Sequence, residues 1–208
     1  MQRIIMSTLP DRMVSSASPR KAACDSPESA LMQILSRNNS NVRIRTASSI
    51  KDAEFFYPPT DAEIAAYDHE SIAAIRNQDL TKLKQFKEAG RPLKCSNKFG
   101  ESLLHMACRK GMLTVTSFMV TEGLVPWEVC DDYGRSPLHD ACWAHTTNFD
   151  LVDLILKDCP DLLYIEDKRG NTPLSYLTQS KWAAWTEYLQ RKPVEMLLPR
   201  RSELFVSK

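Results

Sequence analysis

Apolar residues recur at helical spacing in several segments along the middle of the chain. Three of these segments are VTSFMV (115–120), LVDLILKDC (151–159) and WAAWTEYLQ (182–190). Each collects its apolar side chains in one stripe, which is typical of an amphipathic helix. A fourth segment, residues 71–90, carries such a stripe on both sides of the polar stretch Asn77-Gln78-Asp79. We therefore predict one helix in each of the three segments and two short helices within residues 71–90.

A glycine-centred sequence precedes each of the three later helices. NKFGESLLHMAC (97–108), DDYGRSPLHDAC (131–142) and DKRGNTPLSYLT (167–178) align on their glycines, with spacings of 34 and 36 residues. A fixed period of roughly 20–50 residues is typical of a repeat architecture, in which short units bury their apolar faces against one another. We predict an all-α fold of about four stacked helix-turn-helix repeats. The leucine four positions after each glycine should point into the core: Leu104, Leu138 and Leu174.

These segments resemble the ankyrin-repeat family, whose motif is D-x-x-G-x-T-P-L-H-x-A-A with a period of about 33 residues. Residues 131–142 match best, whereas the preceding copy has Leu103 in place of proline. The last copy departs at Ser175 and Leu177, as terminal repeats that face water on one side often do. The resemblance implies an ankyrin-repeat solenoid, with a turn and two antiparallel helices in each repeat.

Three regions follow from this pattern. Pro58, Pro59 and a capping box from Thr60 to Glu63 mark the start of a repeat domain over residues 58–192. Residues 1–57 bear serine, asparagine and scattered charge, and we predict a disordered N-terminal segment there. Within it, Arg45-Thr46-Ala47-Ser48 loosely fits a basophilic kinase site. Residues 193–208 are predicted to form a C-terminal cap or tail.

The sequence His-x-x-Cys occurs twice, at His105–Cys108 and at His139–Cys142. Packed helices lie about 9 Å apart, whereas zinc ligands lie within about 2.3 Å of the ion. Four ligands from two repeats therefore cannot converge, and a thiol nucleophile would need an orienting third group. We predict buried, inert thiols and no metal or cofactor. The resemblance implies that both histidines tie their turns to neighbouring backbone.

Composition and charge argue against several classes of function. The chain is 43% hydrophobic and 25% charged, as in a soluble globular protein, and no apolar run approaches the roughly 18–20 residues that cross a bilayer. Residues 51–190 hold 15 basic and 21 acidic residues, so we expect no nucleic-acid binding by the folded core. Six cysteines without a secretory signal favour reduced thiols and an intracellular location, cytoplasmic or nuclear. An organelle transit peptide is the alternative for the N-terminus.

The resemblance implies a non-catalytic protein that binds another protein through its concave face, formed by the turn tips and the first helices. We predict a monomeric adaptor or regulatory subunit; the alternative is a thiol-based redox or metal-responsive sensor. Tyr, Trp and Arg most often carry interface energy. For Phe99 and Tyr176, packing against a neighbouring repeat is the alternative. The variable positions of the motif give the candidate partner-binding residues: Phe99, Met106, Arg109, Tyr133, Arg135, Asp140, Trp143, Arg169 and Tyr176.

Overall fold

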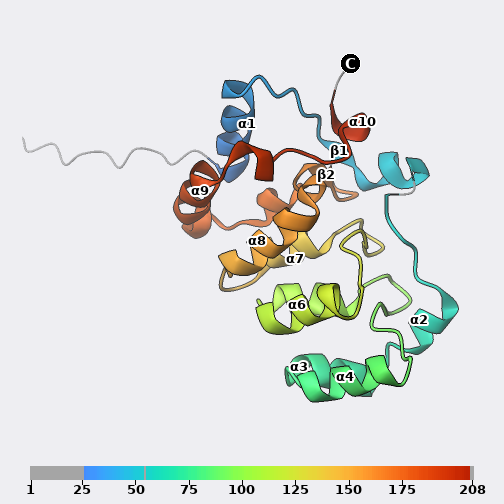
Figure 1. Ribbon diagram of the computed structural model, residues 1–208. Coiled ribbons are helices and arrows are strands. Elements are labelled where there is room, and N and C mark those ends of the chain that lie inside the picture. The colour runs from blue at the N-terminus through green and yellow to red at the C-terminus, as the bar shows by residue number, and fades with distance from the viewer. Residues whose placement is uncertain (1–25, 54, 207–208) are drawn as a thin grey trace, which may run out of the picture.

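The computed structural model describes residues 26–53 and 55–206, and its repeat region is a stack of four helical layers (Figure 1). Each of the first three layers is a pair of helices joined by a short loop. The pairs are α3 (His69–Arg76) with α4 (Leu80–Glu88), α5 (Leu103–Arg109) with α6 (Leu113–Thr121), and α7 (Pro137–Trp143) with α8 (Phe149–Asp158). In the fourth layer a 3₁₀ turn, η3 (Pro173–Tyr176), takes the place of the first helix and leads through η4 (Gln179–Lys181) to α9 (Trp182–Arg191). The predicted all-α repeat fold is confirmed.

Side chains at the helix starts explain where the helices begin. The Thr60 hydroxyl accepts the Glu63 N–H at 3.3 Å, while the Glu63 carboxylate accepts the Thr60 N–H at 2.8 Å, which caps α2 (Asp61–Ala65) as predicted. Asp68 and Asp79 cap α3 and α4 in turn, and Asn77 and Gln78 lie between these two helices. The predicted break within residues 71–90 is therefore confirmed.

The core runs continuously through the stack. The three motif leucines are buried, Leu104 and Leu138 completely and Leu174 to 3% exposure, as predicted. Small residues beside them, Ala107 and Ala141, are also buried, which lets α5 pack closely against α7.

Residues N-terminal to the repeats also fold onto the stack. Helix α1 (Pro27–Arg37) packs against α9 and buries Leu31 and Leu35, and the Glu28 carboxylate accepts a hydrogen bond from Thr172 at 2.7 Å. The predicted disordered segment 1–57 is thus corrected for residues 26–53 and 55–57, while residues 1–25 lie outside the described residues. The apolar residues of this segment are too sparse to form a core alone. They are buried because the last repeat supplies an apolar partner surface.

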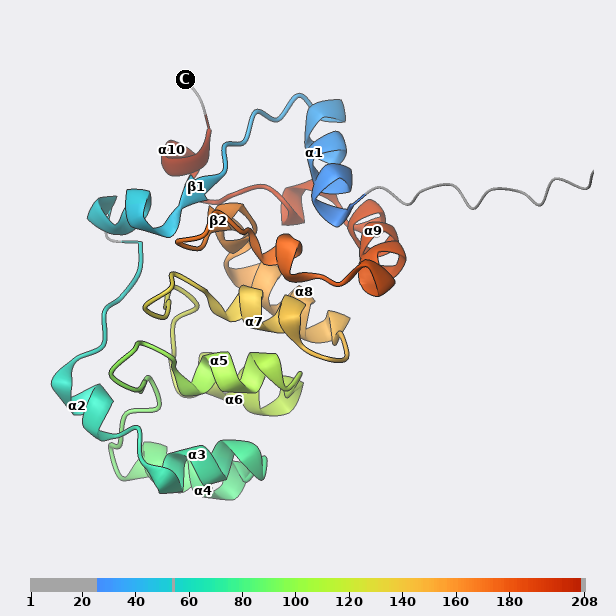
Figure 2. The same cartoon turned by 180° about the vertical axis from the view of Figure 1, so that it is seen from behind.

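A strap (residues 42–53 and 55–59) then crosses from this end of the stack to α2 at the other. It contains β1 (Arg45–Thr46), which pairs in parallel with β2 (Ile165–Glu166), and η1 (Ala47–Ala53). Figure 2 shows it running along the side of the stack that carries the turns. Ile50 and Phe55 anchor it, since both are fully buried.

The C-terminal residues fold back beside β1. They form η5 (Val194–Met196) and α10 (Ser202–Phe205), which pack near η2 (Pro160–Tyr164). The Tyr164 hydroxyl donates to the Leu197 carbonyl, and Phe205 is fully buried. A β-bridge joins Val42 to Val206, so the C-terminal end of the described chain pairs with the start of the strap. Within the described residues, none of the helices has the length and apolar character that crossing a membrane requires.

Candidate protein-binding face

Three turns form the tips of the repeats, and each is held by one polar side chain. The Oδ1 atom of Asp131 accepts two backbone N–H groups of its own turn, at 3.0 and 2.8 Å. Asn97 and Asp167 hold the other two turns in the same way. Gly134 has a φ of 80°, a left-handed conformation that glycine adopts without steric cost. The tips therefore have a fixed shape.

Backbone hydrogen bonds join one tip to the next. The N–H of Asp132 donates to the carbonyl oxygen of Phe99 at 2.7 Å, and the N–H of Lys168 donates to that of Tyr133 at 2.8 Å. The three tips thus form a ladder whose spacing is set by the backbone.

The two motif histidines join the repeats below the tips. The Nδ1 atom of His139 accepts the Ser136 N–H at 3.0 Å, so Nε2 carries the proton and donates to the Asn171 carbonyl at 3.1 Å. His105 makes the equivalent contacts with its own N-cap residue and with the carbonyl of Arg135, at 2.9 Å. Both rings are buried, and burial lowers the pKa of His139 to about 4. The predicted bracing role is confirmed.

The cysteines of the two His-x-x-Cys sequences belong to the core. Cys108 and Cys142 are fully buried, and burial raises the pKa of both thiols. Burial likewise raises the pKa of Cys95 to about 12. In the described part of the chain, no cluster of three or more His, Cys, Asp or Glu side chains is placed to hold a metal ion. Cys24 lies outside the described residues.

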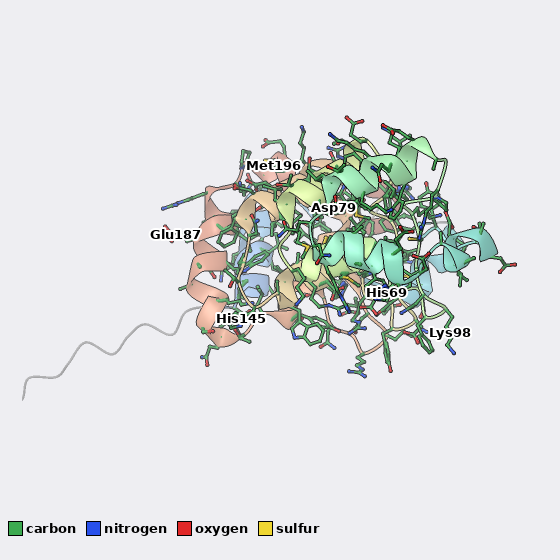
Figure 3. All side chains as sticks on the ribbon, turned by 90° about the horizontal axis from the view of Figure 1, so that it is seen from below. His69, Asp79, Lys98, His145, Glu187 and Met196 are labelled. Carbon is green, nitrogen blue, oxygen red and sulfur yellow. The ribbon has the colours of Figure 1, made fainter. Side chains whose placement is uncertain are left out.

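The turn tips and the first helices form one surface, here called the inner face, which corresponds to the concave face expected from the sequence. Figure 3 views the stack along its axis, with Lys98 at the turn end of the molecule and His145 at the end where α7 stops. Three aromatic side chains are exposed on the inner face: Phe99 to 53%, Tyr133 to 45% and Trp143 to 51%.

Arginine side chains lie against these aromatic rings. The Tyr133 ring has the Arg135 guanidinium 5.3 Å from its centroid and the Arg169 guanidinium at 5.1 Å. The Arg109 guanidinium lies 5.5 Å from the Trp143 ring. Cations at this distance attract the faces of aromatic rings, which restrains both partners.

Buried carboxylates hold two of these arginines in turn. Arg109 donates to both carboxylate oxygens of Asp140, each at 3.0 Å, and to Glu101 at 2.7 Å. Burial alone would lower the pKa of Arg109, but the hydrogen bonds and charges of Asp140 and Glu101 outweigh it and raise the pKa. Asp140 is only 2% exposed, because Arg109 from the preceding repeat covers it. Arg135 donates to the Asp131 carboxylate at 2.7 Å.

Two other candidate residues are half-buried. Tyr176 donates its hydroxyl to Asp167 at 2.6 Å, and its ring lies edge-on to His139, with 5.3 Å between centroids. Burial is the largest cause that raises the pKa of Tyr176, followed by its bond to Asp167. Met106 packs against the core. Of the nine candidates, four are exposed, four are half-buried, and Asp140 is buried rather than exposed.

A family model for ankyrin repeats, described as three copies, matches residues 71–162. Residues 71–162 are ankyrin repeats. The matched residues extend from within α3 into η2 and contain the turns at Gly100 and Gly134. The fourth layer of the stack, η3 with α9, lies beyond the matched residues, in keeping with its departures from the motif. A search of curated proteins finds no match.

The strap adds a second wall beside the ankyrin turns. A groove of about 720 Å³ lies between the turns and the strap, and Phe56 and Tyr57 line it from the strap side. Lys98, Phe99 and Lys168 line it from the turns. This groove could not be predicted, because residues 42–57 were expected to be disordered. The apolar sequence FFYPP (55–59) was the available signal.

Proposed function

We propose that this ankyrin-repeat protein is a non-catalytic adaptor or regulatory subunit that binds a partner protein through its inner face. Ankyrin repeats are in general protein–protein interaction modules. The observation that carries the proposal is the set of exposed aromatic rings, Tyr133 and Trp143 above all, each flanked by an arginine that is itself held in place.

Rigidity of the inner face favours binding. A partner that settles on a flexible surface must order it, at roughly 0.5–1.5 kcal/mol for each long side chain that is immobilised. Arg109 and Arg135 are already fixed by carboxylates, and the turn tips are fixed by the backbone ladder. Little conformational freedom is therefore left to lose at these positions.

The candidate residues divide into two roles under this proposal. Phe99, Tyr133, Trp143 and Arg169 are exposed and would contact the partner. Asp140 and Tyr176 would support the contact residues without touching the partner, because their polar atoms are already hydrogen-bonded within the stack. Met106, Arg109 and Arg135 present only part of their side chains and would form the floor of the interface.

The test compares wild-type protein with a Tyr133→Ala, Trp143→Ala double variant. Each is used to capture binding proteins, and the partner that the wild type retains is then purified and titrated against both. We expect the double variant to bind at least about thirtyfold more weakly, the loss of one true hot spot.

Leu124→Ala is the matched control, because Leu124 is 80% exposed but follows α6, away from the inner face. Circular dichroism should show all variants folded. Equal affinity of the double variant and the wild type for the same partner would refute the proposed face.

A further inference from the structure

Ser48 lies on the strap, in a sequence that the proposed function does not use. The residues before it read Arg43-Ile44-Arg45-Thr46-Ala47, which gives the only Arg-x-Arg-x-x-Ser in the chain. Arginine recognises carboxylates through paired, charge-assisted hydrogen bonds, and kinases select substrates partly by charge pattern. Two arginines at these positions suit a kinase whose substrate groove is acidic.

The side chains of this sequence are accessible. Ser48 and Arg43 are exposed and Arg45 is partly exposed. The β1 pairing that holds the segment covers only two residues, Arg45 opposite Ile165 and Thr46 opposite Glu166. The Val42–Val206 bridge and the buried side chains of Ala47 and Ile50 also hold the segment, so it must open locally to enter a kinase groove.

Ser48 also lines the groove between the strap and the turns, together with Lys168 and Lys98. Its neighbour Ala47 lies against the turn of Gly134: a Cβ added to that glycine would be 2.8 Å from the Ala47 Cβ and 3.5 Å from the Lys168 backbone nitrogen. The strap residue next to Ser48 and the Lys168 backbone therefore meet at one point on the turn.

The charges around this groove favour an added anion. Lys168 and Lys98 are exposed, and Asp132 is the exposed acid among the lining residues. Asp131 also lines the groove, but its carboxylate is paired with Arg135. Two cations thus stand against one unpaired anion.

We propose that Ser48 is a phosphorylation site for a basophilic protein kinase, and that the phosphate is held by Lys168 across the groove. In the reaction, the Ser48 Oγ attacks the γ-phosphorus of ATP. The new Oγ–P bond replaces the bond to the bridging oxygen of ADP, and the hydroxyl proton passes to the kinase. The product carries about two negative charges and three acceptor oxygens beside the lysine. It therefore fastens the strap to the turns.

The first experiment treats the folded protein with ATP and a kinase that requires arginine at both positions, and maps the phosphate by mass spectrometry. We expect phosphate on Ser48, none at this site in Ser48→Ala, and no change in Ser49→Ala. Arg45→Gln should lower kcat/KM at least about tenfold, the value of one charged hydrogen bond. A peptide of residues 41–52 is the positive control. Modification of the peptide but not of Ser48 in the protein would overturn the proposal, as would phosphate only at other serines.

The second experiment follows the phosphate by phosphorus NMR as a function of pH. A nearby lysine favours the dianion, so we expect the pKa of the phosphoserine to lie about half a pH unit lower in the wild type than in Lys168→Gln. Lys110→Gln, which removes an exposed lysine outside this groove, is the matched control and should leave that pKa unchanged. Identical pKa values in the wild type and Lys168→Gln would overturn the pairing with Lys168.

Discussion

The Nε2 atom of His139 lies 3.1 Å from the carbonyl oxygen of Asn171, 32 residues further along the chain. This contact ties the third layer of the stack to the fourth. It uses the neutral ring, because Nδ1 accepts a backbone N–H from Ser136 at the same time. A second proton on the ring would occupy Nδ1 and leave the buried N–H of Ser136 without that acceptor.

Stability should therefore fall as the pH falls. The pKa of His139 is about 4 in the folded protein against 6.5 for an ordinary histidine, so the unfolded chain binds more protons between these values. The stabilisation is complete above pH 6.5 and is lost as the pH falls to about 4. Urea unfolding at about pH 5 should give a free energy of unfolding about 2 kcal/mol below that at pH 8 from this group. A His139→Gln variant should show a flatter pH dependence, and an unchanged slope would contradict the assignment.

Substitution of Gly134 by alanine should destabilise the protein more than substitution of Gly170 by alanine. Both glycines have left-handed backbones, with φ of 80° and 79°, so each substitution carries about 1 kcal/mol of backbone strain. A Cβ at Gly134 would also lie 2.8 Å from the Ala47 Cβ, whereas a Cβ at Gly170 would meet nothing within 4 Å. We expect a further loss of about 1 kcal/mol or more at Gly134 in chemical denaturation. The extra loss should shrink in an Ala47→Gly background; if it does not, the strap is not its cause.

Arg109→Gln should destabilise the protein by about 1–3 kcal/mol, because it leaves the buried Asp140 carboxylate without its main partner. The variants Arg109→Gln and Asp140→Asn should not be additive, with an interaction energy of about 1 kcal/mol in a double-mutant cycle. Arg191→Gln is the control, since its ion pair with Glu187 is exposed and should be worth less than about 0.5 kcal/mol. If the two losses of stability were strictly additive, the interaction between Arg109 and Asp140 would contribute nothing to stability.

Thiol labelling distinguishes the proposed adaptor function from the alternative function as a thiol sensor. Cys108 and Cys142 are fully buried with raised pKa values, so we expect no reaction with an aromatic disulfide reagent until the protein unfolds. Mass spectrometry after a brief exposure identifies the labelled positions, and denatured protein serves as the control. Rapid modification of either cysteine in the native state would favour the sensor.

The repeat fold could be predicted from the sequence because each unit carries its own local signals. The turn glycines, the motif leucines and the capping box at Thr60 each depend on residues close by in the chain, and the structure places them as predicted. Helix α1 and the strap could not be predicted in this way. Leu31, Ile50 and Phe55 are far apart in a polar segment, and each is buried by a surface that exists only once the stack has formed.

The candidate face was predictable in position but not in detail. The exposed rings of Phe99, Tyr133 and Trp143 follow from the repeat register. The burial of Asp140 does not, because it depends on Arg109, 31 residues earlier, reaching across from the preceding layer. Contacts between repeats of this kind are set by stacking geometry, which a single motif does not encode.

The docking of α1 on α9 sets the order in which parts of the chain can fold. Most repeat stacks consolidate from neighbour to neighbour, so each unit can settle soon after it is made. Here Glu28 meets Thr172, 144 positions later. Helix α1 is synthesised before the repeats and must therefore wait for α9 and η3 before it can dock.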